Sequence, residues 1–411
     1  MTSALAPLRE REFRLLFAGR VVSFAGTAMA PIALAFGVLE LGGSAGDLGL
    51  VLTLSILPQV FFLLVGGVIA DRLPRQLVMV ASNVVSGLAQ AVAAFLLITG
   101  SAEIWHLAAV AFVRAIASSF FFPAQQGIIP QTVPVELLQP ANALLRLTLN
   151  ATNIGGAALG GLVVAAAGPG WALAFDALTY LVAAALLLQM RIVPPARGAT
   201  SSFVAELREG WGAFRTRTWL WVVVLGFAFS NGATAAAMGV LGPIVAEESL
   251  GGAGVWGLVI GAQGIGLVLG GLIALRIHPA RPLLLGVASV TLLVPPIALL
   301  ALGAPWPVIA LAAVLAGVGV ELFSVFWDVS LMGHVPNELL SRVSAWDAIG
   351  SLVLMPAAYA VIGPASEAFG ITATLWGCVA IATAAILAQL LSSDVRNLPH
   401  PVPRRTEVQA A

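Results

Sequence analysis

Ionisable side chains inside apolar runs are the residues of this sequence most able to do chemistry. Arg114 lies in the apolar run 104–126. Glu321 lies in the run 306–332, and Asp328 follows it by seven residues, two helical turns along the same face. A charged group at the centre of a membrane-spanning helix costs about 2.5–3.5 kcal/mol on insertion scales, so each is a functional candidate.

Binding and release of a proton is the chemistry open to Glu321. Burial and a nearby positive charge both change the pKa of a carboxyl group. We predict that Glu321 binds the proton, with Arg114 facing it across a central cavity and Asp328 as a further coupling candidate. A fixed structural ion pair between Arg114 and Glu321 is the alternative.

Three further acids are assigned structural roles. Asp328 and Asp347 lie nearer the ends of their runs, where capping of a helix is the favoured role, although Asp328 is kept among the coupling candidates. Asp176 lies inside the run 171–190, and we interpret it as a structural hydrogen-bonding group.

The composition requires a membrane environment for most of the chain. Of the 411 residues, 60% are hydrophobic and 9% are charged, and the mean hydropathy is +1.01. In soluble domains about 45–50% of residues are apolar and about 25% are charged. The first apolar run reaches residue 39 and is preceded by Glu10 and Glu12, which favours a span over a signal peptide. Cys378 lies in an apolar run and is predicted to be a packing residue.

Twelve runs are long enough to cross a bilayer, which needs about 20 apolar residues. They lie near 15–39, 47–70, 76–99, 104–126, 141–167, 171–190, 219–246, 254–276, 282–302, 306–332, 344–364 and 370–392. The pattern predicts an all-α polytopic membrane protein with twelve transmembrane helices. The expected domains are a six-helix half over 1–190, a linker over 191–218 with an amphipathic helix at 203–214, a second six-helix half over 219–392 and a tail over 393–411.

Arginine placement predicts the orientation, because cytoplasmic connections carry the excess of positive charge. The sequence has 19 arginines and no lysine. Arginines lie at alternate connections and at both termini, as Arg72, Arg75, Arg146, Arg191, Arg197, Arg208, Arg215, Arg217, Arg276, Arg281, Arg342, Arg9, Arg11, Arg14, Arg396, Arg404 and Arg405. The opposite connections hold acids and no arginine. We expect a bacterial inner-membrane protein with both termini in the cytoplasm.

A short hairpin occurs twice. Residues 66–72, Gly-Gly-Val-Ile-Ala-Asp-Arg, align with residues 270–276, Gly-Gly-Leu-Ile-Ala-Leu-Arg, at an offset of 204. The glycines, the alanine and the arginine recur, whereas Asp71 does not. Paired six-span halves are typical of secondary transporters.

The first hairpin resembles the loop signature of the major facilitator superfamily, Gly-x-Leu-Ala-Asp-Arg-x-Gly-Arg-Lys. Gly67, Ala70, Asp71, Arg72 and Arg75 match it, while Pro74 and Gln76 depart from it. The segments 13–20, 140–144 and 334–343 are similar to bacterial exporters of the enterobactin-exporter and macrolide-efflux type.

This resemblance implies roles for several residues. Gly67, Asp71, Arg72 and Arg75 would form a conformational latch against the start of the eleventh span near Ser344. Arg114 matches the family's buried arginine that is linked to proton transfer. The segment 155–161 resembles an antiporter signature with Ala157 in place of proline. Small residues in spans 5 and 8 would allow close helix packing: Gly156, Gly160, Gly161, Gly266 and Gly270.

The expected cargo is a small lipophilic or amphipathic compound such as an antibiotic, drug or secondary metabolite. The cavity candidates are aromatic residues, methionines and a few polar residues of spans 1, 4, 7 and 10: Phe24, Thr27, Met29, Phe121, Gln125, Phe227, Asn231, Met238, Phe323 and Trp327. Related exporters often carry an acid after the glycine of span 1, where this chain has Gly26-Thr27.

The sequence therefore predicts a proton-coupled exporter. Uptake, uniport, or movement of a siderophore, lipid or nutrient in the same fold is the second hypothesis, and a membrane enzyme or sensor is the third. We expect a small-molecule substrate, protons and the lipid bilayer as partners, and a monomer. We expect no cofactor, metal or nucleic acid, because there is no phosphate-binding loop and no metal-ligand spacing.

Overall fold

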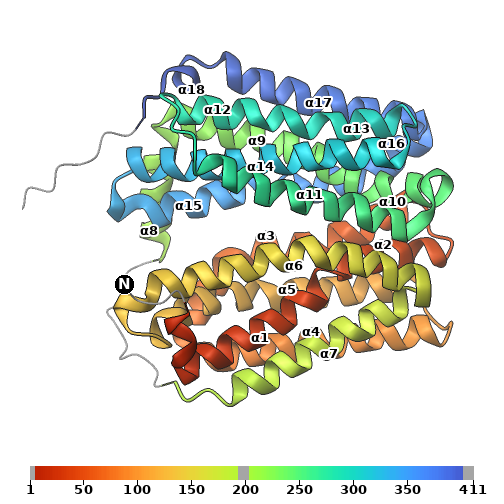
Figure 1. Cartoon of the computed structure of the whole chain (residues 1–411), viewed down its shortest axis with the longest axis horizontal. Helices are drawn as coiled ribbons and strands as arrows, with labels where there is room; N and C mark the ends of the chain where they lie inside the picture. Colours follow the sequence, from red (N-terminus) through yellow and green to blue (C-terminus); the bar gives the residue numbers. More distant parts are fainter. Residues whose placement is uncertain (1–4, 193–202, 401–411) are drawn as a thin grey trace, which may run out of the picture.

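The computed structural model of the chain describes residues 5–192 and 203–400 (Figure 1). Within these ranges it describes side chains except those of 63–72, 150, 153–154, 203–207, 337 and 341. The described residues form helices and no strand. Figure 1 shows the helices packed side by side as one elongated bundle, with the first half of the chain below and the second half above.

The first half of the chain contributes helices α1 to α7. Its elements are η1 (Ala6–Arg9), α1 (Arg11–Thr27), α2 (Ala30–Glu40), α3 (Ala45–Arg72), α4 (Arg75–Ile98), α5 (Ile104–Ile128), η2 (Ile129–Gln131), η3 (Val135–Leu137), α6 (Leu138–Ala167) and α7 (Pro169–Leu188).

The second half begins after α8 (Phe203–Arg215), which lies inside the predicted linker 191–218. Its elements are α9 (Thr218–Ala236), η4 (Ala237–Leu241), α10 (Gly242–Val245), η5 (Ala246–Leu250), α11 (Gly252–Ala274), α12 (Pro282–Ser289), η6 (Val290–Leu293), α13 (Val294–Ala301), α14 (Trp306–His334), α15 (Asn337–Leu352), α16 (Met355–Phe369), α17 (Ile371–Leu391) and α18 (Ser393–Asn397). Both η4 and η5 are single π-helical turns.

The predicted all-α membrane fold is confirmed. Eleven helical stretches in the described residues are long and apolar enough to cross a membrane, and α6 contains a shorter apolar helix at Gly155–Ala167. Each of the twelve predicted runs coincides with one helix or with two or more consecutive helical segments. Proline accounts for two of the breaks, because it cannot donate a hydrogen bond to the residue four positions earlier. Thus α1 ends four residues before Pro31, and α15 ends four residues before Pro356.

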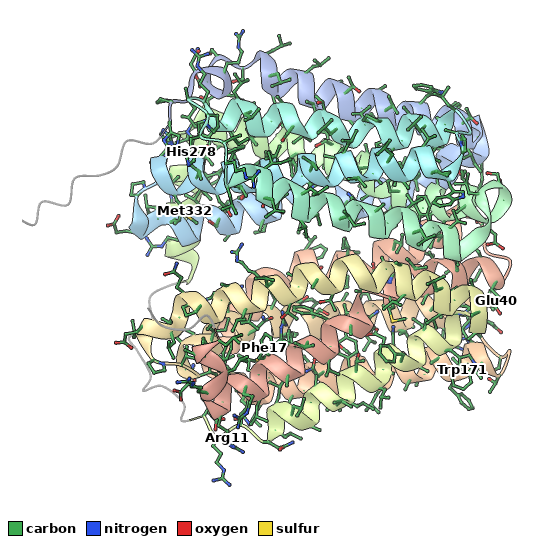
Figure 2. The ribbon with its side chains drawn as sticks, in the orientation of Figure 1. Arg11, Phe17, Glu40, Trp171, His278 and Met332 are labelled. Carbon is green, nitrogen blue, oxygen red and sulfur yellow. The ribbon has the colours of Figure 1, made fainter. Side chains whose placement is uncertain are left out.

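The bundle has two distinguishable ends. Figure 2 places Glu40 and Trp171 at one end, which we call the far end. Arg11, His278 and Met332 lie toward the other end, where α8 also lies, and we call this the linker end. The helices α3 and α11 begin at the far end, and α6 and α16 end there.

The contacts between the two halves gather toward the far end. A methyl group on Gly363 of α16 would overlap Gly46 of α3, and a methyl group on Gly161 of α6 would lie 2.8 Å from Cα of Gly257 in α11. The Thr53 hydroxyl donates a hydrogen bond of 3.2 Å to the carbonyl of Pro356. Toward the linker end the ribbons of the two halves lie wider apart in Figure 1.

The predicted packing glycines divide between two kinds of contact. Gly161 packs across the two halves, as expected for spans 5 and 8. The others approach a neighbour within their own half: Gly156 and Gly160 lie against Ala28 and Met29, and Gly266 and Gly270 lie against α14. Close helix approach is thus used mainly to build each half.

Candidate functional site

Arg114 lies in a buried polar cluster inside the first half. Its guanidinium Nη2 is 3.6 Å from a carboxylate oxygen of Asp176, a fully buried residue of α7. It also donates a hydrogen bond of 3.1 Å to the hydroxyl of Tyr180. The Gln90 amide of α4 donates a 2.9 Å hydrogen bond to the same Asp176 oxygen. The ion-pair partner of Arg114 is therefore Asp176 of the same half, and Glu321 lies in the other half.

Span 1 closes over this cluster through Gly26. A methyl group at Gly26 would overlap the Thr179 hydroxyl and would lie 2.7 Å from Oδ1 of Asp176. The next residue, Thr27, has its hydroxyl 3.1 Å from that of Tyr180. The acid that follows the span 1 glycine in related exporters is absent here, yet Asp176 brings a carboxylate to the same glycine from α7.

A second arginine, Arg20 of α1, lies between two aromatic rings. Its guanidinium carbon is 4.0 Å from the ring centre of Phe24 and 5.3 Å from that of Phe121. Its Nε is buried and has no hydrogen-bond partner. Phe24 and Phe121 were predicted to contact cargo, and both are half-buried.

The acids predicted to lie inside spans of the second half are on α14 and α15. Glu321 is half-buried. Gly270, in the second copy of the hairpin, lies so close to it that a methyl group added to Gly270 would be 2.8 Å from Cβ of Glu321. Asp328 is also half-buried, and both carboxylates interact electrostatically with Arg146 of α6 in the first half. Among the described residues Arg146 forms no ion pair within 4 Å. The two acids and Arg146 are thus opposite charges on different halves that form no ion pair in this conformation.

Asp347 has a hydrogen-bonding role within the second half. Its carboxylate accepts a hydrogen bond of 2.8 Å from the indole N–H of Trp327 and one of 3.2 Å from the hydroxyl of Ser351. Because α15 begins at Asn337, Asp347 lies well inside the helix rather than at its start, so the predicted capping position is wrong.

Three of the predicted cavity residues form one aromatic stack. The rings of Phe227 and Phe323 stack at 4.5 Å, and Phe323 stacks on Trp327 at 5.9 Å. Phe323 and Trp327 are both 7% exposed, and both belong to the packed core between α9 and α14. In this conformation Phe227, which is half-buried, is the most accessible member.

The remaining cavity candidates are dispersed. Met29 is buried and lines a groove of α1, α6 and α7. Gln125 is 6% exposed, with its amide oxygen unpartnered. Asn231 donates a 3.4 Å hydrogen bond to the carbonyl of Ser351, and Met238 packs partly buried near the far end.

The first hairpin is tied to its own half by the residues that follow it. The Arg75 guanidinium donates a 2.6 Å hydrogen bond to the carbonyl of Gly127, and the Gln76 amide donates to the carbonyls of Leu187 and Met190. The side chains of the predicted latch residues Gly67, Asp71 and Arg72 lie outside the described residues. The expected docking position near Ser344 is not a helix start, because α15 begins seven residues earlier.

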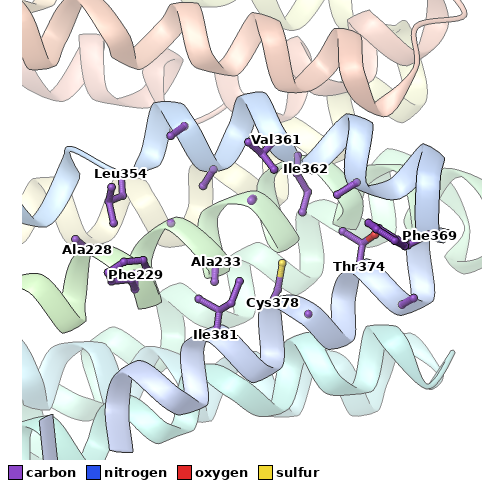
Figure 3. Close-up of a pocket in the computed structure, with 17 residues that line it drawn as sticks. Ala228, Phe229, Ala233, Leu354, Val361, Ile362, Phe369, Thr374, Cys378 and Ile381 are labelled. Atoms are coloured by element: carbon purple, nitrogen blue, oxygen red, sulfur yellow. The ribbon is translucent and has the colours of Figure 1, made fainter. Parts of the chain in front are cut away.

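Two apolar grooves occur at equivalent places in the two halves. One, of about 590 Å³, lies between α9, α16 and α17, and its lining includes Cys378 and Thr374 (Figure 3). The other, of about 790 Å³, lies between α1, α6 and α7. Their linings contain no ionisable side chain apart from Cys378, so the grooves are separate from the charged groups described above.

The comparisons with known proteins identify the family. The family model described as transmembrane secretion effector, MFS_3, matches residues 2–404. The chain belongs to this family of the major facilitator superfamily. The family and the named relatives are those of multi-pass membrane transporters, not of enzymes.

Named relatives of this transporter include exporters. It is 24% identical to the enterobactin exporter EntS of Shigella boydii over 353 residues, covering 83% of this chain and 84% of that protein. It is 25% identical to macrolide efflux protein A of Streptococcus pyogenes over 217 residues, covering 52% of this chain and 54% of the relative. The chain thus spans about half the length of that efflux protein.

Solved structures support the fold alone. The nucleoside transporter NupG aligns with a TM-score of 0.74 at 13% identity, covering 92% of this chain and 98% of that one. A bacterial homologue of the human lysosomal transporter Spinster, in an inward-facing and unoccupied conformation, aligns with a TM-score of 0.68 at 15% identity, covering 95% of this chain and 98% of that one.

Sequence reasoning missed Arg20, Gln90, Tyr180 and the role of Arg146. Arg20 had the same signal as Arg114, since it is an arginine inside an apolar run. Gln90 and Tyr180 are uncharged and acquire importance only through their contacts with Asp176 and Arg114. Arg146 was counted only for orientation.

Proposed function

We propose that this transporter exports a small lipophilic or amphipathic compound in exchange for protons, by alternating access. The observation that carries the proposal is the opposition of Glu321 and Asp328, on α14, to Arg146, on α6 of the other half. The relatives named for efflux of macrolides and export of enterobactin support the outward direction.

The orientation follows from the charge at the two ends. Arginines of the hairpin, the linker and α15 belong to the linker end, whereas Asp47, Glu103 and Glu367 belong to connections at the far end. The excess of positive charge marks the cytoplasmic side of a membrane protein. We therefore assign the linker end to the cytoplasm of a bacterial inner membrane, and the far end to the outside.

With this assignment, the halves are joined on the outside and the conformation faces inward. The glycine contacts Gly46 to Gly363 and Gly161 to Gly257 hold the outer ends together through backbone packing. Such contacts contain no ion pair and can separate as whole helices rock. Cargo then enters between the halves from the cytoplasmic side.

Protonation would control the cytoplasmic side through Arg146. Deprotonated Glu321 and Asp328 attract Arg146 and favour closure of the linker end, which opens the outside. Protonation from the outside removes the negative charges and with them the attraction, so the linker end opens again. Release of the proton to the cytoplasm and binding of cargo complete the exchange.

Asp71 is proposed to act as a second element, a latch at the cytoplasmic end. A carboxylate near the exposed N–H groups of a helix start contributes about 0.3–2 kcal/mol, enough to bias two states of similar energy. Because α15 begins at Asn337, its first turn is the docking position for Asp71 and Arg72 when the linker end closes. The substitution Asp71→Asn should slow transport while leaving equilibrium binding of cargo unchanged.

The experiment that tests the coupling uses everted membrane vesicles with an imposed pH gradient. Expression in an efflux-deficient host, screened for resistance over diverse compounds, supplies the cargo. Wild-type vesicles should accumulate it when the gradient is imposed, and Glu321→Gln should abolish the dependence on the gradient. The control is Glu136→Gln, which changes an exposed glutamate of η3 outside the proposed latch and coupling groups.

Two outcomes would contradict the proposal. Coupling that survives Glu321→Gln would remove Glu321 from the mechanism. Flux in the wild type that ignores the pH gradient would favour uniport or another driving ion, and with it the uptake or movement of a siderophore, lipid or nutrient in the same fold.

A further inference from the structure

Within the part of the chain that the structure describes, Arg20 is a half-buried cation that has no counterion, and its Nε is buried without a hydrogen-bond partner. Among the described residues no carboxylate lies within 4 Å of its guanidinium, and no hydrogen bond to it is formed. Arg114 and Gln90 both contact Oδ2 of Asp176, whereas its Oδ1 is buried without a hydrogen-bond partner in the described ranges. Removing an arginine from water without a partner costs several kcal/mol unless an anion or hydrogen-bond acceptors replace the water.

Its depth separates Arg20 from an ordinary membrane anchor. It lies nine residues after Arg11, about 13 Å along α1 from the start of the helix. Its guanidinium packs against Phe24 of its own helix and Phe121 of α5 rather than extending to the linker end. Ring contacts satisfy the faces of a guanidinium but leave its N–H groups, which point outward in its plane, free to donate.

The surroundings suit one end of an amphipathic molecule. Phe24 and Phe121 are half-buried, so the guanidinium between them can be reached. Aromatic rings beside a planar donor fork match a flat apolar body that carries a carboxylate, sulfonate or similar anion.

We propose that Arg20 is an anion-binding site, at which the guanidinium binds the acidic group of an anionic amphiphile while Phe24 and Phe121 contact its apolar part. This inference rests on the proposed export function only in one respect, namely that the bound amphiphile is the transported compound. The site therefore narrows the cargo class from lipophilic compounds in general to those with an acidic group.

The test compares two probes that differ only in charge. 8-Anilinonaphthalene-1-sulfonate is anionic, and N-phenyl-1-naphthylamine is its uncharged counterpart. Binding to the purified transporter in phosphatidylcholine nanodiscs is followed by energy transfer from the protein's 10 tryptophans. The variants are Arg20→Gln, Arg20→Lys and, as matched control, Arg14→Gln, an exposed arginine of the same helix.

The wild type should bind the sulfonate saturably. Arg20→Gln should weaken sulfonate binding at least about tenfold, the size expected for a lost charge-assisted hydrogen bond. The same substitution should change the affinity for the uncharged probe by less than about twofold, since the aromatic contacts remain. Arg20→Lys should fall between, because a lysine keeps the charge but not the planar fork. Arg14→Gln should change neither probe.

Several results would overturn the site. These are a wild type that does not bind the sulfonate, equal loss of both probes in Arg20→Gln, and equal loss in Arg14→Gln. Repeating the titration in nanodiscs that contain phosphatidylglycerol identifies the occupant. If the lipid weakens sulfonate binding to the wild type but not to Arg20→Gln, an anionic lipid fills the site. If the lipid does not weaken sulfonate binding, the site is assigned to cargo. Because binding is measured without a pH gradient, it can succeed while proton coupling fails, and the reverse.

Discussion

Asp176 and Cys378 occupy equivalent places in the two halves, eight residues after the glycines Gly168 and Gly370 that precede α7 and α17. In the first half this place holds a buried carboxylate bound to Arg114. In the second half it holds a thiol that lines an apolar groove. Counted from the turn glycines Gly100 and Gly303, the equivalent of Arg114 is Gly317. The second half thus has no counterpart of the internal ion pair.

The second half instead carries two acids of α14, Glu321 and Asp328, whose charges act on an arginine of the other half. Glu321 and Asp328 interact with Arg146 across the boundary, and Gly317 allows α11 and α14 to pack closely. An ion pair inside one half is unchanged when the halves rock as rigid bodies. Charges opposed between the halves change their separation with every cycle. The charges inside the first half therefore suit a structural role, whereas the charges between the two halves are available for coupling.

The largest effect should follow from breaking the internal pair. We expect Asp176→Asn to destabilise the protein by about 3–5 kcal/mol, because Arg114 would stay buried without its carboxylate. Thermal unfolding of the purified protein in detergent measures the loss. Asp394→Asn, at an exposed aspartate of α18, should leave the midpoint unchanged.

A double substitution sharpens this result. Replacing both partners, by Asp176→Leu with Arg114→Leu, removes the buried charges together and should recover part of the stability that Asp176→Asn loses. Equal stability of wild type and Asp176→Asn would mean that the pair is not structural, and the comparison between the halves would fail.

Gly26→Ala should produce the next largest effect. The added methyl group would overlap Thr179 and press on Asp176, and overpacking of this kind costs about 1–3 kcal/mol. The same unfolding assay measures it. Gly155→Ala, where a methyl group meets no atom within 4 Å, is the control, and an unchanged Gly26→Ala would show that α1 and α7 can separate at no cost.

Glu321→Gln should change stability by less than about 1 kcal/mol while it abolishes coupling to the pH gradient. Glu321 is half-buried and forms no ion pair or hydrogen bond among the described residues, so the folded state loses little. Unfolding and transport are measured on the same preparation. A loss of stability as large as that of Asp176→Asn would mark Glu321 as a structural group.

The spans and the family were predictable because hydropathy and the hairpin signature are local properties of the chain. The partner of Arg114 was not, since a buried arginine is satisfied by whichever acid the packing brings to it, and here α7 supplies Asp176. The boundary near Ser344 was misplaced because α15 continues through the polar turn that contains Glu338 and Arg342. Phe323 and Trp327 were chosen as cavity residues by type, whereas rotation of α14 turns them into the core with α9.

The smallest effect tests the apolar grooves, where the halves also differ. Gly377 of α17 lines one groove, and its equivalent, Phe175 of α7, lines the other. A methyl group at Gly377 meets no atom within 4 Å, so Gly377→Ala should stabilise the protein by about 0.5–1 kcal/mol through the lower helix propensity of glycine alone. Unfolding in detergent measures the gain. A destabilised Gly377→Ala would mean that the groove closes around Gly377 in the membrane protein, and that α9, α16 and α17 pack as tightly as α1 packs on α7 at Gly26.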